Sequence, residues 1–326
     1  MAVLIGIDEA GFGPILGPLV VSSSGFSLPR RLLSTGRLTV ETDLWRILRT
    51  SLGSRRKGLA GRLLVTDSKK AYSRSLGIKH LQRTVLTYLR CLDKRANTLA
   101  ELVALLCPDC LQRLNDYPWY KGAEDYKIGT DEADMAIASA VLKKDLAANG
   151  IKFLGFESHC LDVAYYNKMM VSVKNKANVL FTATSGLIKC AFDNFGGDDL
   201  QIIIDRQGGR IHYRKNLQRT FGGLELKILS ESATASSYEL WDDGKRVRLH
   251  FVVGAEQRFL PAALASMVSK YLRELLVDNI NRYFTRFHAE LRPTAGYWKD
   301  GLRFIEDLKT NTPHIQYDRN QLIRCR

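Results

Sequence analysis

The chain has 326 residues, of which 45% are hydrophobic and 25% charged, values that are ordinary for a folded protein and exclude wholesale disorder. Its 25 glycines and 8 prolines follow no fixed period, which excludes a collagen-like chain, and no apolar run approaches the ~20 residues of a membrane span. Lysine and arginine outnumber aspartate and glutamate by 48 to 34, and the resulting net charge of +14 favours a polyanionic partner, above all nucleic acid.

Strands and helices are predicted from the spacing of apolar residues. Short apolar runs or alternating patterns predict strands over 3–7, 19–21, 151–156, 200–205, 223–230 and 246–253. Apolar positions three and four residues apart predict helices over 43–53, 78–96, 131–148, 160–193 and 261–285. Because strands and helices do not alternate strictly, we expect a mixed α/β domain rather than a doubly wound sheet.

Four acidic side chains lie beside predicted core elements. Asp8 and Glu9 follow the first buried strand, Asp205 ends another, and Glu274 lies among apolar residues of the longest predicted helix. Carboxylates in such places are costly unless they are paired or bind a cation. If the two strands are neighbours, Asp8 and Asp205 could share one ion, and oxygen ligands suit Mg²⁺ or Mn²⁺. Taken singly, each acid is better explained as a helix cap, a turn residue or a salt-bridge partner.

The six cysteines and the first residues bear on location and on a second metal. No basic leader precedes Asp8, so the pattern is not that of a secretion signal, and we expect reduced thiols, a cytoplasmic location and no membrane association. Cys107 and Cys110 form a C-x-x-C pair, but a structural zinc needs four ligands and no second pair of matching spacing exists. We therefore expect two buried thiols there. Nothing indicates assembly, so a monomer is favoured.

Five motifs together resemble the type 2 ribonucleases H. A Gly-x-Gly-Pro turn alone usually marks a hairpin, but the segment 6–14 (GIDEAGFGP), continued by 17–21 (GPLVV), resembles the opening of that family. Four further motifs follow in the family's order: 67–70 (DSKK), 202–205 (IIID), 262–274 (AALASMVSKYLRE) and 296–297 (GY). The ordered set, spread over most of the chain, is far more specific than any single motif.

The resemblance implies a ribonuclease H-like fold, with a mixed sheet flanked by helices and a small C-terminal helical extension. It implies that two divalent ions, Mg²⁺ or Mn²⁺, activate water to cut the RNA strand of an RNA–DNA hybrid, leaving 5′-phosphate and 3′-hydroxyl ends. The metal-binding catalytic residues it implies are Asp8, which would bridge both ions, Glu9, Asp205 and Glu274. The substrate-facing residues it implies are Gly11, Phe12, Gly13, Ser68, Lys69 and Tyr297.

Two departures from the family pattern bear on the substrate. Phe12 stands where the family usually has arginine, which removes a fork of donors that could hold a phosphate. Glu274 stands where the fourth acid is usually aspartate. The substrate is therefore either a uniform hybrid or a duplex with ribonucleotides embedded in DNA. The alternatives are a non-catalytic or altered-specificity nucleic-acid-binding relative, and a subunit whose inserted segment docks a partner.

Basic residues follow the strand that ends at Asp205. Arg206 and Arg210, interleaved with the aromatic Tyr213, predict contacts with phosphates, although a solvated loop would look the same. The predicted division of the chain is a catalytic domain over 1–285, an insertion at about 95–145, an extra hairpin region within 207–252, and a substrate-contacting segment over 286–326.

Overall fold

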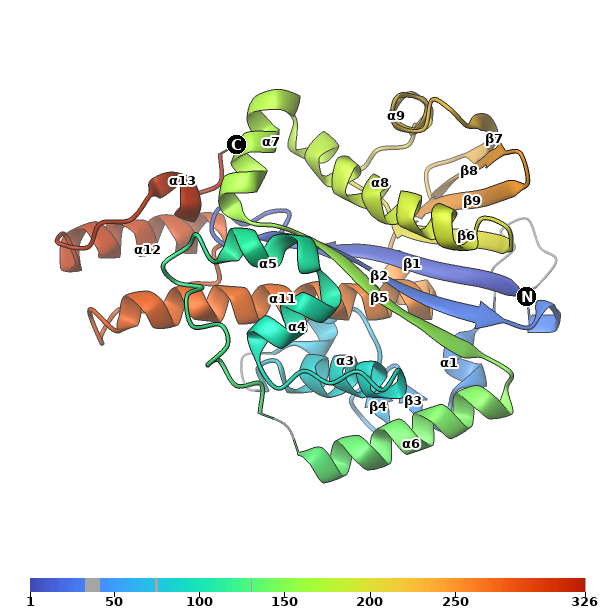
Figure 1. Cartoon of the computed structure of the whole chain (residues 1–326), viewed down its shortest axis with the longest axis horizontal. Helices are drawn as coiled ribbons and strands as arrows, with labels where there is room; N and C mark the ends of the chain where they lie inside the picture. Colours follow the sequence, from blue (N-terminus) through green and yellow to red (C-terminus); the bar gives the residue numbers. More distant parts are fainter. Residues whose placement is uncertain (33–41, 74–75, 130, 326) are drawn as a thin grey trace.

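A seven-stranded mixed sheet forms the centre of the computed structural model, which describes residues 1–32, 42–73, 76–129 and 131–325 (Figure 1). In chain order its strands are β1 (Ala2–Ala10), β2 (Leu19–Leu28), β5 (Lys152–Leu161), β6 (Asp199–Asp205), β7 (Glu225–Glu231), β8 (Ala235–Asp242) and β9 (Lys245–Val252). They lie side by side in the order β5-β2-β1-β6-β9-β8-β7. The three central strands β1, β6 and β9 are parallel, and every other pairing is antiparallel.

Two long helices cover the faces of the sheet. Helix α11 (Leu260–Thr285) lies against one face and α8 (Lys176–Phe195) against the other, as Figure 1 shows. Helix α11 is apolar around most of its circumference because it is buried between the sheet and further helices. Gly6 permits this packing, since a Cβ at Gly6 would lie 2.1 Å from the backbone nitrogen of Ala262.

The remaining elements surround this frame. They are η1 (Arg30–Leu32), α1 (Leu44–Ile47), the short pair β3 (Leu52–Gly53) and β4 (Leu63–Leu64), α2 (Ser68–Ala71), α3 (Lys79–Cys91), α4 (Leu99–Leu106), α5 (Pro108–Leu114), α6 (Glu132–Ala148), α7 (Val163–Val173), α9 (Arg214–Thr220), α10 (Ala255–Arg258), α12 (Trp298–Asn311) and α13 (Arg319–Leu322). The mixed α/β fold and its C-terminal helical extension, α12 and α13, are as the sequence predicts.

Three predicted helices are shorter than expected. The helix predicted over 160–193 begins inside β5 and is divided in two, because Lys174 adopts a left-handed conformation (φ 51°) between α7 and α8. The helix predicted over 78–96 ends at Cys91, just before the left-handed Asp93 (φ 57°). In the segment 43–53 only α1 is α-helical, and the chain then pairs as β3. Apolar spacing alone does not reveal such interruptions.

The two segments that the sequence predicts to be additional lie at different places in the fold. The segment at about 95–145, of which residue 130 lies outside the described part, holds α4, α5 and most of α6 on the same side of the sheet as α11 (Figure 1). The hairpin of β8 and β9 turns at Gly244 (φ 91°), and β9 pairs directly with β6, so this region extends the central sheet. Residue 326 of the C-terminal segment also lies outside the described residues. Among the described helices none has the length and apolar character to cross a membrane.

Candidate active site

Three of the predicted acids meet near the carboxyl ends of two central strands of the sheet. Strands β1 and β6 are parallel neighbours, with Ile7 opposite Ile204, so the next residues, Asp8 and Asp205, lie side by side near the carboxyl ends of the two strands. Asp8 and Glu9 do not follow β1 as the sequence predicts but belong to it, because β2 continues to pair with β1 as far as Ala10. Glu9 follows Asp8 directly. The two strands are buried apolar runs until they reach these acids, which is why the carboxyl groups lie at the border of the core. Asp8 is only 7% exposed.

A fourth carboxyl group joins them from the neighbouring strand. Strand β9 pairs with β6, with Val252 opposite Asp205, and the chain then turns at Gly254 (φ 63°) into α10. The backbone N–H of Ala255 donates a hydrogen bond of 2.9 Å to Oδ1 of Asp205. This contact places Glu256 close enough to Asp205 for its carboxyl group to raise the pKa of Asp205.

The acids disturb one another's ionisation. Burial, with repulsion from Glu9 and then Asp205, raises the pKa of Asp8 well above its ordinary value. Burial, with repulsion from Asp205, raises the pKa of Glu9 to about 7, although Lys69 opposes the rise. Burial raises the pKa of Asp205 to about 6, with Glu256 adding to the effect and the hydrogen bond from Ala255 opposing it. A cation bound among these carboxyl groups would therefore favour their charged forms.

The chemistry of the cluster fits a hard divalent cation. Its donors are all carboxylate oxygens, the ligands that Mg²⁺ and Mn²⁺ prefer. Oε2 of Glu256 is buried and has no hydrogen-bond partner, which leaves an acceptor free for a cation or its water. Over residues 1–32, 42–73, 76–129 and 131–325, no three His, Cys, Asp or Glu side chains already stand at metal-ligand spacing. Side-chain rotations are therefore needed for the acids to close around an ion.

Glu274 lies outside this cluster. Its Oε1 is 2.6 Å from Nζ of Lys270 and 3.4 Å from Nη1 of Arg273. The face of α11 that turns toward β1 carries Ser266, which hydrogen-bonds to the Asp8 carboxyl group, and Ser269, which donates to the Asp8 carbonyl oxygen at 3.0 Å. Glu274 lies on a different stripe of the helix. The fourth carboxyl group that the structure brings to the other three is that of Glu256.

The sequence carries a signal for Glu256. This acid comes four residues after the end of β9, a strand that runs parallel to the two that carry Asp8 and Asp205. Carboxyl ends of parallel neighbours meet on one side of a sheet, so Glu256 is a third acid close to a strand end. Glu274 is instead implied by the resemblance, because it lies within the long helical motif.

The second motif lies directly beside the acids. Asp67 caps α2, accepting a hydrogen bond from the backbone N–H of Lys69 at 2.9 Å. Oγ of Ser68 is 3.0 Å from Oγ of Ser266, the serine that also contacts Asp8. Lys69 is exposed, and its charge lowers the pKa of Glu9. The structure thus brings the predicted Ser68 and Lys69 to the acid cluster.

The glycine loop after β1 packs against the buried guanidinium of Arg273. Gly11 has φ 96°, and a Cβ there would lie 2.7 Å from Nε of Arg273. Gly13 differs, since it is exposed and no atom lies within 4 Å of the place its Cβ would take. Nζ of Lys176, at the start of α8, lies 4.7 Å from the centre of the Phe12 ring. The loop is anchored at Gly11 and open to solvent at Gly13.

Tyr297 is carried to this loop by the C-terminal segment. The carbonyl oxygen of Gly296 accepts hydrogen bonds from the N–H groups of Ile15 (2.8 Å) and Leu16 (3.2 Å). The guanidinium of Arg273 lies 6.0 Å from the centre of the Tyr297 ring, which is itself 51% exposed. The predicted substrate-facing tyrosine therefore lies on the surface beside the glycine loop.

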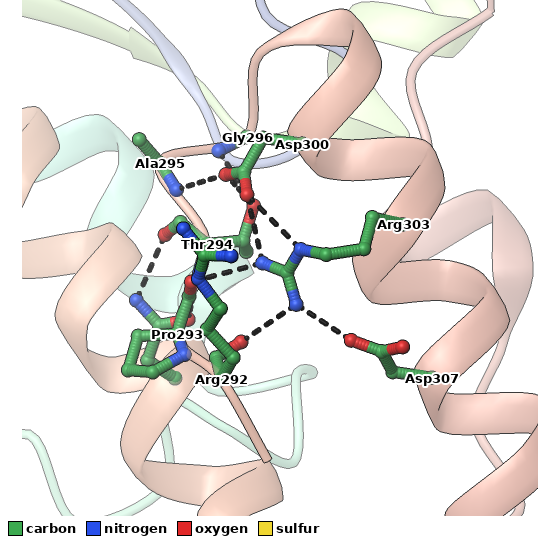
Figure 2. Close-up of polar contacts among 9 residues, drawn as sticks. Arg292, Pro293, Thr294, Ala295, Gly296, Asp300, Arg303 and Asp307 are labelled. Carbon is green, nitrogen blue, oxygen red and sulfur yellow. Dashed lines mark hydrogen bonds and ion pairs between the residues drawn. The ribbon is translucent and has the colours of Figure 1, made fainter.

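A polar network that the sequence does not reveal holds the segment before Tyr297 (Figure 2). Oδ2 of Asp300 accepts hydrogen bonds from Oγ1 of Thr294 (2.6 Å) and from the N–H of Ala295 (2.8 Å). Arg303 pairs with Asp300 at 2.7 Å and with Asp307 at 2.6 Å. Its guanidinium also donates to the carbonyl oxygens of the two residues before Thr294, at 3.0 Å each. Helix α12 thus fixes the turn that presents the tyrosine.

The two predicted phosphate-binding arginines have partners within the protein. The guanidinium of Arg206 donates to the carbonyl oxygens of Ala233 (2.5 Å) and Ser232 (2.8 Å) in the turn between β7 and β8. The guanidinium of Arg210 donates to Oδ1 of Asn178 at 2.9 Å. Both contacts hold the chain that leaves β6, and a role in binding phosphate stays a prediction.

The chain is similar to several solved structures. No family model matches the chain, and no curated protein does. Ribonuclease HII of Archaeoglobus fulgidus, in a complex with PCNA, matches with a TM-score of 0.45 and 16% identity over 99% of this chain and 94% of that one. Aquifex aeolicus RNase H3 matches with a TM-score of 0.43 and 13% identity, over 98% and 71%.

A further match has bound Mn²⁺. Bst-RNase HIII in complex with Mn²⁺ matches with a TM-score of 0.40 and 13% identity, over 94% of this chain and 62% of that one. All of these matched structures are ribonucleases HII or HIII, at low identity and with modest TM-scores. In its sequence motifs and in the solved structures to which it is similar, the chain resembles the type 2 ribonucleases H.

Proposed function

We propose that this protein is a divalent-metal-dependent endoribonuclease that hydrolyses the RNA strand of RNA–DNA hybrids, leaving 5′-phosphate and 3′-hydroxyl ends. The observation that carries the proposal is the convergence of Asp8, Glu9, Asp205 and Glu256 at the ends of three parallel neighbouring strands. Burial and crowding raise the pKa values of Asp8, Glu9 and Asp205, and such perturbed carboxyl groups are expensive for the fold and typical of functional sites.

The residues of the site would have different roles. When bound, divalent cations supply a water of lowered pKa and neutralise charge on the leaving 3′-oxygen. Asp8 and Asp205, on adjacent strands, would hold the cations from two sides, while Glu9 and Glu256 would complete the carboxylate shell. The hydrogen bond from Ala255 orients Asp205, and Lys69 favours the charged form of Glu9.

The glycine loop and Tyr297 provide the surface for the ribose. Because no atom lies near the missing Cβ of Gly13, a sugar could approach the backbone N–H groups of the loop closely. Tyr297 offers an exposed ring at the edge of the same loop. Lys176, over the ring of Phe12, places a cation where the family usually has the arginine of the loop.

The test is cleavage of an end-labelled RNA–DNA hybrid by the full chain in Mg²⁺ or Mn²⁺, with chelator and Asp8→Asn as controls. We expect internal cuts that need the metal and disappear in the Asp8→Asn variant. Binding of the hybrid without cleavage in either metal, unchanged by Asp8→Asn, would instead identify a non-catalytic nucleic-acid-binding relative.

A second arm distinguishes two substrate classes. Phe12 lacks the donor fork with which a guanidinium could hold a phosphate at the junction between ribose and deoxyribose. This favours uniform hybrid tracts over single ribonucleotides embedded in DNA. A duplex with one ribonucleotide should therefore be cut more slowly than a uniform hybrid of the same sequence, and the reverse order would show that Lys176 and the loop recognise the junction.

A further inference from the structure

Three buried thiols meet outside the candidate active site. Cys107 and Cys110 lie at the junction of α4 and α5, within the insertion at about 95–145, and Cys160 lies on the edge strand β5. The Sγ atoms of Cys107 and Cys110 are 3.3 Å apart, and Cys160 lines the same cavity as both. None of the three side chains has a role in the proposed hydrolysis.

The pair is positioned for a disulfide with little movement. Cys107 immediately precedes the first residue of α5, and Cys110 lies within the first turn of that helix. A disulfide needs its two sulfur atoms ~2.05 Å apart, so the Sγ atoms must approach by only ~1.3 Å. Side-chain rotation within one helical turn is enough, and the rest of α5 can stay in place.

A cavity leads from the surface to these sulfurs. It has a volume of about 240 Å³ and is lined by all three cysteines together with Asp109 and Tyr165. Asp109 is exposed and the Tyr165 side chain is 39% exposed, so the cavity reaches solvent although the thiols themselves are nearly covered. The cavity has room for a molecule the size of hydrogen peroxide next to the sulfurs.

The surroundings favour ionisation of Cys110 over that of the other two thiols. Hydrogen bonds from Cys107 and then from Cys160 lower the pKa of the Cys110 thiol to about 5, and the charge of Arg113 acts in the same direction. The same hydrogen bonds raise the pKa of Cys107 and of Cys160 well above the ordinary value. A single thiolate with a protonated thiol at 3.3 Å is the arrangement of an attacking and a resolving cysteine.

We propose that Cys107 and Cys110 are a peroxide-reactive dithiol site that forms a reversible intramolecular disulfide. The Cys110 thiolate attacks one peroxide oxygen, the O–O bond breaks, and the departing hydroxide takes up a proton to leave as water, with sulfenic acid at Cys110. Sγ of Cys107 then attacks Sγ of Cys110, and its proton leaves with the displaced hydroxide as a second water. The two thiols are oxidised, the peroxide is reduced, and a dithiol reductant reverses the change.

A zinc site is the less favourable explanation of the same thiols. Zinc in structural sites takes four ligands, and the three cysteines supply three. The histidine next to Cys160, His159, lines the same cavity, but its ring packs against Gly186 of α8, and within the described part of the chain no three His, Cys, Asp or Glu side chains stand at metal-ligand spacing. The experiment below therefore includes bound zinc as one of its possible results.

The test is a titration of the reduced full chain with hydrogen peroxide at pH 6, in the presence of chelator, followed by alkylation in denaturant and peptide mass spectrometry. We expect loss of two hydrogens, located to a Cys107–Cys110 disulfide and reversed by dithiothreitol. Because its thiolate predominates at this pH, Cys110 should react ~10-fold faster than the exposed Cys325.

Variants separate the attacking from the resolving sulfur. Cys107→Ser should accumulate a sulfenic acid at Cys110 that dimedone captures, Cys110→Ser should yield neither product, and the matched control Cys325→Ser should behave as the parent. Oxidation at Cys325 alone, a Cys110–Cys160 cross-link in place of the expected one, or co-purified zinc that blocks oxidation would each overturn the proposal. Peptide mapping of the parent chain decides the question even if Cys110→Ser does not fold.

Discussion

The backbone N–H of Ala255 donates to Oδ1 of Asp205 at 2.9 Å, so the end of β6 fixes the turn that follows β9. The consequence is that Glu256, the next residue, is held against Asp205 before any ligand binds. Asp205 and Ala255, which are 50 positions apart in sequence, thereby join the end of β6 to the turn after β9 in one carboxylate cluster. The hydrogen bond uses one lone pair of Asp205, while Oε2 of the adjacent Glu256 is buried without a hydrogen-bond partner.

The first prediction separates Glu256 from Glu274. Glu256→Gln should lower kcat for hybrid cleavage by at least ~100-fold, because it removes a carboxylate from the cation-binding cluster. Glu274→Gln should leave kcat nearly unchanged but cost ~1–3 kcal/mol of stability, because the buried Arg273 loses part of its counter-charge. Steady-state kinetics and urea unfolding check both variants. An equal loss of kcat in both variants would indicate that Glu274 also belongs to the cation-binding site.

The second prediction concerns stability and pH without metal. The folded-state pKa of Glu9, about 7, lies above its ordinary value of 4.5, so between these values the folded protein binds more protons than the unfolded chain. The free energy of unfolding should therefore fall as the pH rises from 5 to 8 in chelator. Glu9→Gln should recover ~1–3 kcal/mol at pH 8 and little at pH 5. Urea unfolding measures both, and Glu124→Gln, at an exposed acid, is the matched control.

Cation binding should release protons. At pH 6.5 part of the Glu9 and Asp205 population is protonated, because their pKa values are about 7 and 6. A divalent cation binds the ionised carboxylates, so titration with Mn²⁺ must expel these protons. Calorimetry in two buffers of different ionisation enthalpy gives their number. Glu9→Gln should lower the number of protons released. The affinity of the parent chain for Mn²⁺ should rise from pH 6 to pH 8. An affinity that does not change with pH would contradict the placement of the cation among these acids.

Two glycines of the same motif should respond differently to alanine. A Cβ at Gly6 would lie 2.1 Å from backbone atoms of Pro261 and Ala262, which cannot move without shifting α11. Gly6→Ala should therefore cost ~3 kcal/mol or more, or prevent folding. Gly13→Ala has open space and should keep its stability while weakening hybrid binding. Soluble yield, urea unfolding and binding of labelled hybrid distinguish the two effects, and equal stability of both variants would argue against the packing of α11 on β1.

The sequence predicts the parts of this protein that local patterns encode. The apolar runs that end at Asp8 and Asp205 identify two central strands and their acids, and the apolar circumference of residues 261–285 identifies the longest helix. Glu256 is not encoded locally, because its place depends on β9 pairing with β6 and on the hydrogen bond to Asp205. The break between α7 and α8 at Lys174 is not predicted for a related reason. A left-handed backbone at a lysine depends on how the two flanking helices pack and not on the local sequence pattern.

Lys176 provides the last prediction, on nucleic-acid binding. Its ammonium group lies 4.7 Å from the centre of the Phe12 ring and is otherwise exposed, so it can meet a phosphate beside the glycine loop. Lys176→Gln should weaken hybrid binding and lower the slope of log affinity against log salt by about one, as expected for one lost phosphate contact. Lys189→Gln, on the same helix but paired with Asp193, is the control with the same change of charge. A parallel loss in both variants would indicate a general effect of net charge, whereas a loss confined to Lys176→Gln would place a phosphate next to Phe12.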